Sequence, residues 1–125
     1  MDELKLIIPG RLPGLNQYIE AERRHRMAAA AMKKTVQEDC MRAMLSAKKK
    51  GISFDKCEIE FHWVEPNKRR DKDNIRGFGS KVILDALQKM GILKNDNWEY
   101  VEKLTDRFSV DKENPRVEVT LKEVS

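Results

Sequence analysis

Two aspartates two positions apart, in the second of the chain's two basic blocks, form the pattern with the clearest chemical meaning. Asp71 and Asp73 interrupt the run Lys68-Arg69-Arg70-Asp71-Lys72-Asp73-Asn74. In a loop or extended segment, side chains two positions apart lie on the same side, so both carboxylates are expected to point to one place. Such a pair repels unless a cation lies between its members. The neighbouring basic side chains are one source of that charge, and a metal is the other. Oxygen ligands of this kind suit Mg²⁺ or Mn²⁺ better than zinc.

The residues that follow predict a polar stripe on a helix. Asn74, Phe78, Lys81 and Asp85 follow one another in steps of four, three and four, the spacing of a single helical face. Asp96 lies just beyond the expected end of this helix and reaches the stripe only if its loop folds back. These residues therefore extend the possible site from the aspartate pair toward a third carboxylate.

A purely structural interpretation of the same residues is open at this point. Asp73 or Asn74 can cap the helix, and Lys81 and Asp85 can form a surface ion pair. The segment Asn95-Asp96-Asn97 can be an ordinary turn. This interpretation leaves unexplained why carboxylates stand inside so basic a loop, whereas a nuclease needs acids to hold a metal and bases to hold phosphate.

The positive charge is concentrated in two blocks. The chain has 125 residues, 25 basic and 21 acidic, with a formal net charge of +4. Residues 23–50 carry nine basic and two acidic side chains, and residues 66–81 carry six and two. Clustered Lys and Arg favour a polyanion partner, because phosphate binding releases counterions. The alternative is a solvated helix face and a basic loop.

Length and composition restrict the class of protein. The 125 residues predict a single domain over residues 1–125. Apolar runs are too short for a membrane-spanning helix, and the N-terminus does not have the pattern of a signal peptide. Two cysteines, Cys40 and Cys57, are too few for a disulfide framework, and we expect both to be packing residues. A reduced, cytoplasmic protein without a membrane partner is expected.

Hydrophobic periodicity predicts six elements that must position the polar residues. Alternation favours strands at 2–8, 56–64, 101–111 and 116–122. The absence of Pro and Gly favours a long helix at about 20–50, and a second helix is expected at about 74–90. The order is β-α-β-α-β-β, which predicts an α+β fold with two helices on a small mixed sheet. We expect Trp63 and Trp98 in the core, with stacking on a base or on a partner subunit as the alternative for Trp98.

At the level of motifs, the chain resembles the RusA family of Holliday-junction resolvases, which phages and prophages often encode. The resemblance rests on residues 66–102, and the order of elements agrees with a RusA-like fold. In one place Asn95-Asp96 stands where the family has two aspartates. The matching segments are Arg70-Asp71-Lys72-Asp73-Asn74-Ile75, Lys81-x-x-x-Asp85-Ala86-Leu87, Gly91-Ile92-Leu93 and Asn95-Asp96.

The resemblance implies a homodimeric, Mg²⁺-dependent endodeoxyribonuclease that nicks four-way DNA junctions symmetrically in recombination and repair, with Mn²⁺ as a possible substitute. By motif position, Asp71, Asp73 and Asp96 are the expected metal ligands. Lys81 is the expected functional lysine, with Asp85 orienting it or joining the outer metal shell. The metal is expected to polarise the scissile phosphate and activate a water, while Lys81 stabilises charge in the transition state.

Five basic residues around the aspartate pair are expected to contact DNA phosphates, which position the substrate without reading its sequence. They are Lys68, Arg69, Arg70, Lys72 and Arg76. Two alternatives to a junction resolvase are considered. One is a branched-DNA-binding module that does not cleave, in which the carboxylates only cap and pair. The other is a nuclease for flaps or forks, which would use the same metal chemistry.

Overall fold

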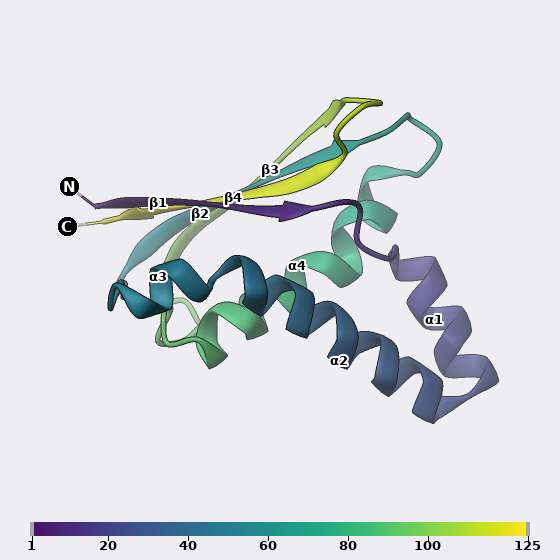
Figure 1. The fold of residues 1–125 in the computed structure, drawn as a ribbon, viewed down its shortest axis with the longest axis horizontal. Coiled ribbons are helices and arrows are strands. Elements are labelled where there is room, and N and C mark those ends of the chain that lie inside the picture. The colour runs from purple at the N-terminus through teal and green to yellow at the C-terminus, as the bar shows by residue number, and fades with distance from the viewer. Residues whose placement is uncertain (1, 125) are drawn as a thin grey trace.

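Four strands form one mixed sheet, in agreement with the predicted fold class. The structure is a computed structural model and describes residues 2–124. The strand order is β1-β4-β2-β3. In this sheet β4 (Arg116–Glu123) lies antiparallel to both β1 (Glu3–Pro9) and β2 (Cys57–Glu65), whereas the edge strand β3 (Val101–Val110) is parallel to β2. Figure 1 shows the start of β1 beside the end of β4, so both chain ends lie at one end of the sheet.

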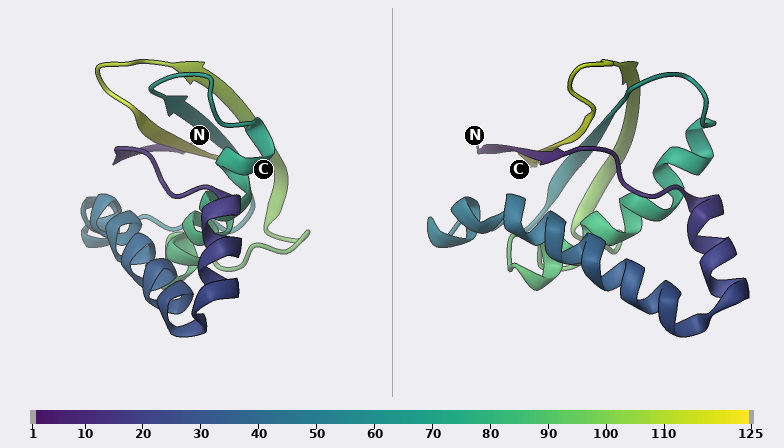
Figure 2. Two further views of the ribbon diagram at one scale, coloured as in Figure 1. Left: turned by 90° about the vertical axis from the view of Figure 1, so that its right-hand side faces the viewer. Right: turned by 45° about the vertical axis from the view of Figure 1, so that its right-hand side comes forward.

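All four helices lie on one face of the sheet, as the two views of Figure 2 show. They are α1 (Leu15–Arg24), α2 (Arg26–Ala43), α3 (Leu45–Lys49) and α4 (Lys72–Lys89). Helix α4 connects the parallel strands β2 and β3, and α1 and α2 pack beside it. Within residues 2–124, no helix is long and apolar enough to cross a membrane.

The prediction of one helix over 20–50 is wrong, because the chain forms three helices there. His25 has an extended backbone (φ −159°, ψ 108°), and at this residue α1 ends and α2 begins at a sharp corner (Figure 1). A continuous helix would carry α1 away from α4. The corner instead lets the Tyr18 ring stack on Phe78 of α4, with 4.7 Å between ring centroids. Tertiary packing therefore overrides local helix propensity at this point.

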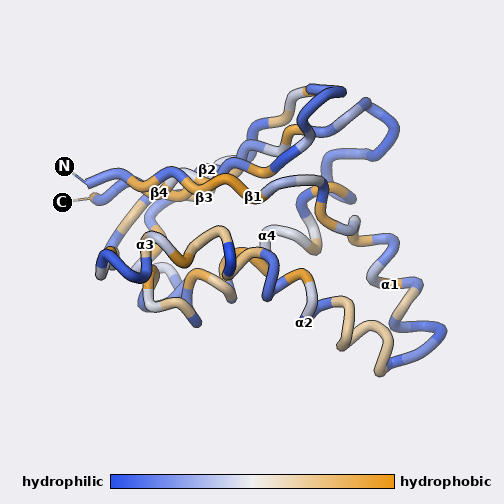
Figure 3. Tube along the Cα trace, viewed as in Figure 1, coloured by the Kyte–Doolittle hydropathy of each residue, from blue (hydrophilic) through white to orange (hydrophobic). Residues whose placement is uncertain are grey.

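Helix α4 is the central packing element of the structure. Ile75, Val82, Leu84 and Ala86 of this helix are all buried. Gly79 brings the helix close to β2, since a Cβ atom there would lie 3.0 Å from the Trp63 ring. The hydropathy colouring in Figure 3 shows apolar residues along the inner elements and hydrophilic residues in the loops. The position of α4, and of its first residues, is thus set by close packing.

The predictions for most other core residues are confirmed. Phe61 and Trp63 are buried, with Trp63 only 1% exposed. Cys40 and Cys57 are free and buried, and burial raises the pKa of their thiols to about 12 and about 11 respectively. Both cysteines therefore act as packing residues in their neutral form.

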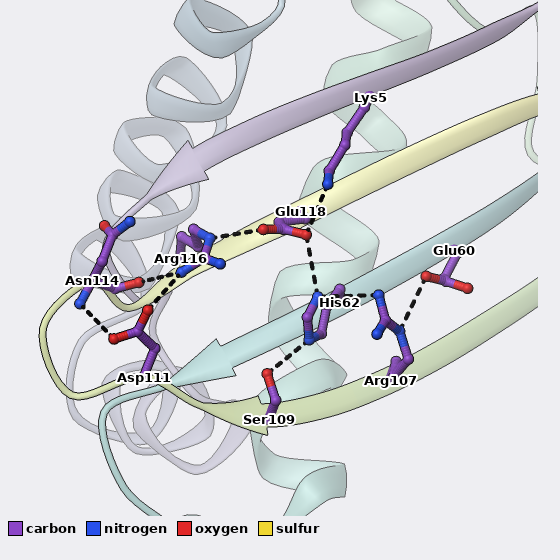
Figure 4. Close-up of polar contacts among 9 residues, drawn as sticks. All are labelled: Lys5, Glu60, His62, Arg107, Ser109, Asp111, Asn114, Arg116 and Glu118. Carbon is purple, nitrogen blue, oxygen red and sulfur yellow. Dashed lines mark hydrogen bonds and ion pairs between the residues drawn. The ribbon is translucent and has the colours of Figure 1, made fainter.

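The open face of the sheet carries a charge-matched polar network, drawn in Figure 4. Its centre is His62 on β2. One ring nitrogen lies 3.2 Å from a Glu118 carboxylate oxygen, and the other lies 2.7 Å from the Ser109 hydroxyl. Arg116 donates to Glu118 at 2.8 Å, and Lys5 pairs with the same carboxylate at 3.2 Å. Each carboxylate drawn in this network has a basic partner, whereas Lys103 and Lys122 farther along the same face have no ion pair among residues 2–124.

Glu118 is the most strongly perturbed acid of this network. The Arg116 guanidinium, with His62 and Lys5 contributing, lowers the pKa of Glu118 to about 2 despite the opposing effect of desolvation. A lowered folded-state pKa stabilises the protein above the ordinary pKa of 4.5, and this stabilisation disappears as the pH falls toward 2. The network should therefore contribute to stability at neutral pH and not in acid.

We predict that Glu118→Gln lowers the free energy of unfolding at pH 7 by about 2 kcal/mol, since a partly buried, charge-assisted hydrogen-bond partner is lost. The difference from the wild type should shrink as the pH falls from about 5 to 2. Urea denaturation across this pH range measures it. Glu38→Gln on the exposed face of α2 is the control, with an expected effect under about 0.5 kcal/mol. A Glu118→Gln effect that does not change with pH would contradict the assignment.

Candidate active site

Asp71 and Asp73 both lie at the start of α4. The expectation of a loop or extended segment across the pair is wrong, because the helix begins at Lys72 and Asp73 is already helical. Asp71 precedes the helix with an extended backbone (φ −70°, ψ 154°), and Asp73 is in the first turn. Both border a hollow of about 610 Å³ where the ends of β2 and β3 meet the start of α4. The hollow mixes carboxylates with basic side chains, and its other lining residues are Glu65, Asn67, Lys68, Arg70, Lys72, Ile75, Phe108, Ser109 and Val110.

The Asp71 and Asp73 side chains are not used for local structure. Asp71 occupies the N-cap position, yet its side chain makes no capping hydrogen bond. Neither carboxylate has a hydrogen bond or an ion pair to any residue in the described part of the chain. Two carboxylates at a helix N-terminus are stabilised by the helix dipole, but they keep all their oxygen lone pairs available. The interpretation in which both residues only cap or pair does not describe this arrangement.

Arg70 holds the loop that presents these carboxylates. Its guanidinium donates to both oxygens of Glu65, at 3.0 and 2.8 Å, and to the backbone carbonyl of Leu12 at 3.1 Å. Arg11 donates to the same Glu65 carboxylate at 3.1 Å. The Glu65 side chain is only 7% exposed. A buried carboxylate with two arginine partners ties the end of β2, the loop after β1 and the start of α4 to one another.

Glu65 is a structural residue that the sequence analysis missed. The only signal was an acidic residue at the end of an otherwise apolar strand face, just before Pro66. The alternation of β2 places Glu65 on the same inward face as Phe61 and Trp63. An acid at an inward position requires a buried basic partner, which here comes from two loops.

The other predicted DNA-contacting residues differ in how available they are. Arg76 donates to Asp106 at 2.7 Å, so its guanidinium is already engaged. The Lys72 ammonium lies over the Phe108 ring, 5.5 Å from its centroid. Lys68 and Arg69 are exposed and have no ion-pair partner among residues 2–124. These last two are therefore the most available basic groups beside the hollow.

The predicted polar stripe of α4 divides between two environments. Asn74 and Phe78 face α1: the Asn74 side-chain oxygen accepts from the backbone N–H of Asn16 at 2.8 Å, and Phe78 stacks on Tyr18. Gly14 permits this approach, since a Cβ atom there would lie 2.6 Å from the Asn74 oxygen. Asn74 thus joins the starts of α1 and α4, and it does not cap its own helix.

Farther along α4, Lys81, Asp85 and Asp96 form a second cluster. The Lys81 ammonium lies 3.2 Å from Asp85 and 3.3 Å from Asp96, and Lys33 of α2 lies 3.9 Å from Asp85. Asp85, and to a smaller extent Asp96, raise the pKa of Lys81. The loop after α4 therefore does fold back and brings Asp96 to the stripe, where Lys81 remains protonated.

The structure does not assemble the predicted cluster of three aspartates. Asp73 and Lys81 are eight residues apart on one helix, a rise of about 12 Å, and Asp96 lies beside Lys81. Among residues 2–124, no three His, Cys, Asp or Glu side chains are close enough to hold one metal ion. For Asp96 to become a third ligand, its contact with Lys81 must break and its loop must move toward the start of α4.

The donor set at the start of α4 nevertheless suits a hard cation. Asp71 and Asp73 offer carboxylate oxygens that no other side chain among residues 2–124 contacts by a hydrogen bond or an ion pair. Mg²⁺ in nucleotide and nucleic-acid enzymes is commonly held by one or two carboxylates, with water and substrate phosphates completing its shell. The pair therefore fits Mg²⁺ or Mn²⁺ in the presence of DNA, and it does not resemble a preformed zinc site.

A basic groove lies on the helical side of the molecule. It is a hollow of about 710 Å³ between α2 and α4. Its basic lining residues are Arg26, Lys33 and Lys34 of α2, which belong to the first basic block, and Lys89 of α4. Glu22 and Asp85 are its acidic lining residues, and Lys33 and Asp85 form the ion pair described above. Asp85 also contacts Lys81, so the groove adjoins the second cluster. The helical side thus carries a groove with more basic than acidic lining residues.

Comparison with known proteins agrees with the motifs and the fold. The family model described as endodeoxyribonuclease RusA matches residues 15–122, which is nearly the whole chain. No curated protein matches the sequence. The match includes α1, α4, the aspartate pair and the Lys81 cluster, and it confirms the resemblance drawn from residues 66–102. The chain belongs to the RusA family of endodeoxyribonucleases, which are Holliday-junction resolvases.

Proposed function

We propose that this protein, as a single domain over residues 1–125, is a metal-dependent, structure-specific endodeoxyribonuclease. It resolves four-way DNA junctions by paired, symmetric nicks, in recombination and repair in the cytoplasm. One observation carries the proposal: Asp71 and Asp73 present unpartnered carboxylates in a hollow lined by basic side chains. Membership of an endodeoxyribonuclease family supports the same chemistry.

Asp71 and Asp73 are the proposed ligands of Mg²⁺, with Mn²⁺ as a substitute. A divalent cation held there would supply Lewis-acid stabilisation to the scissile phosphate. The chain itself orients the two carboxylates through the Arg70–Glu65 pair and the fixed start of α4. Because both carboxylates repel phosphate, this arrangement weakens the binding of DNA when no cation is present.

Lys81 is the proposed basic contact to the DNA strand beyond the hollow. Its raised pKa keeps it charged, and Asp85 and Asp96 hold its ammonium in place. About 12 Å of helix separates it from Asp73, which favours contact with a phosphate farther along the strand. In this assignment Asp85 and Asp96 are positioning residues that act through Lys81.

The remaining DNA contacts are proposed on the helical side. Lys68, Arg69 and Lys72 surround the hollow, and the basic groove that contains Arg26 and Lys34 would receive a second stretch of backbone. Arg70 and Arg76 act mainly by holding the loop and α4, because Glu65 and Asp106 already engage their guanidinium groups.

We propose a homodimer as the active form, and branched DNA as its partner. Two nicks placed symmetrically require two active sites related by a two-fold axis, which a C2 dimer supplies. Selectivity for branched DNA would then follow from the spacing of the two sites and the shape of the junction, since phosphate contacts carry no base information.

Incubation of the purified protein with labelled four-way, forked and linear DNA tests this function. We expect paired nicks in the four-way substrate alone, dependent on added Mg²⁺ or Mn²⁺ and abolished by chelator. Asp71→Asn and Asp73→Asn should each reduce nicking by about 100-fold or more, because several kcal/mol of transition-state stabilisation are lost. Junction binding by both variants should be equal or tighter, since phosphate repulsion is reduced.

Asp39→Asn, on the exposed face of α2, is the matched control and should nick normally. Nicks in the forked substrate in preference to the four-way one would identify a flap or fork nuclease. Binding without any nicks would identify the non-cleaving module. Undiminished nicking by both site variants, or nicking in excess chelator, would contradict the assignment of Asp71 and Asp73.

The salt dependence of junction binding tests the phosphate contacts separately. We predict that the double variant Lys68→Gln, Arg69→Gln lowers the slope of log affinity against log salt by about 2, at roughly 0.9 per phosphate contact. A double change of Lys48 and Lys49 to Gln on α3 removes the same charge at a distant surface and should leave the slope nearly unchanged. Equal slopes for both double variants would exclude Lys68 and Arg69 from the DNA interface.

A further inference from the structure

Trp98 is almost completely exposed, contrary to the expectation that it lies in the core. Its exposed fraction is 97%, whereas the chain's other tryptophan, Trp63, is only 1% exposed. A large aromatic ring fully in water gains none of the burial energy for which such residues are usually retained. It is therefore a candidate contact for a molecule outside this chain.

The loop that carries Trp98 is ordered by its own side chains. The Asn95 side-chain oxygen accepts from the backbone N–H of Asn97 at 3.2 Å. The Asn97 side-chain oxygen accepts in turn from the backbone N–H groups of Glu99 at 2.9 Å and Tyr100 at 3.4 Å. Two consecutive asparagine turns thus lie on either side of Trp98 along the chain. They hold its backbone in a defined conformation while its ring stays exposed. Asn95 acts here as a turn residue.

Trp98 also belongs to the loop that contacts Lys81, one of the groups assigned to DNA. It is two residues beyond Asp96, whose carboxylate lies 3.3 Å from the Lys81 ammonium. The turn is therefore anchored to the middle of α4 at one of the proposed phosphate contacts. A planar ring beside a basic phosphate contact is the combination with which proteins bind unpaired nucleic acid, because the ring stacks on a base while the cation holds its backbone.

The immediate surroundings of Trp98 favour a base over a protein surface. Its neighbours along the loop, Asn95, Asn97 and Glu99, are exposed and polar. The core of a protein interface is usually a contiguous patch enriched in apolar and aromatic groups, whereas stacking on a single base needs only one ring. An isolated tryptophan on an ordered polar turn meets the second requirement.

We propose that Trp98 is a stacking site for an unstacked nucleobase at the branch point of the DNA substrate. This inference rests on the proposed function, because it requires that branched DNA binds near Lys81. Bases at the centre of a duplex are already stacked on both sides and offer no free face. The site would therefore contribute to binding of branched DNA and very little to binding of linear duplex.

The two tryptophans make the proposal directly measurable. Binding is followed in the Asp71→Asn background without Mg²⁺, so that no cleavage is needed. We expect a four-way junction to quench the emission of Trp98 and protect it from iodide, while buried Trp63 is unaffected. Trp98→Phe isolates the Trp63 signal and should show no such change. A fluorescent base analogue at the branch point should in turn be quenched by the Trp98-containing protein.

Affinity gives the second readout. Trp98→Ala should weaken junction binding by about 5- to 150-fold, the range expected for loss of one stacked base, and Trp98→Phe should recover most of it. Binding of linear duplex should change less than about 2-fold. Leu45→Ala, at a 45% exposed apolar residue on α3, is the control and should leave both affinities unchanged.

Each remaining outcome decides against the proposal. Equal junction affinity for Trp98→Ala and the parent would overturn it, as would equal losses on junction and linear duplex. A Trp98 emission shift that follows protein concentration and not DNA would assign the ring to a contact between subunits. These results are independent of nicking: if junctions are nicked normally while Trp98→Ala binds normally, only the stacking site fails.

Discussion

The buried Glu65 carboxylate and its two arginine partners are the constraint on which the candidate site depends. Glu65 ends β2 on the inward face of the sheet, and Arg70 and Arg11 reach it from two different loops. Loss of either the acid or its main partner would leave an uncompensated buried charge, which is strongly unfavourable. The pair therefore fixes the short segment between β2 and α4. Arg70 is engaged by Glu65, and within residues 2–124 the adjacent Asp71 and Asp73 have no basic partner, which leaves them available for a cation.

Helix α4 extends this constraint to the rest of the molecule. Gly79 of α4 packs closely against Trp63, and this contact sets the distance between the helix and the sheet. Asn74 joins the first turn of α4 to α1. The same helix then presents Lys81, which binds the loop containing Asp96. Two polar clusters result, separated along one rigid axis, with the basic groove adjoining the second. In the proposed function, a DNA strand would cross several turns of α4 between these two clusters.

The sequence predicted the fold class, the sheet strands and the existence of α4, because strong alternation and clear breaking residues mark them. It did not predict the corner at His25, where packing of Tyr18 on Phe78 outweighs the helix propensity of an alanine-rich run. The local motif singled out Asp71 and Asp73, which border one hollow, and their role as metal ligands stays a prediction. It was insufficient for Asn74, since helical spacing alone does not determine whether a polar residue faces the site or a neighbouring helix. The position of Asp96 depends on how the loop after α4 folds, which local spacing does not specify. The roles of Arg70 and Glu65 depend on a pairing between separate elements, and the exposure of Trp98 depends on side-chain-capped turns.

The central claim is that Asp71 and Asp73 form the cation site of a nuclease. The most direct test is a crystal structure of the protein with a four-way or duplex DNA and Mn²⁺, with the anomalous signal recorded at the manganese edge. We predict an anomalous peak in contact with both carboxylates and with a phosphate oxygen of the bound strand. Bound DNA with no peak at this pair, or with manganese held only elsewhere in the protein, would contradict it.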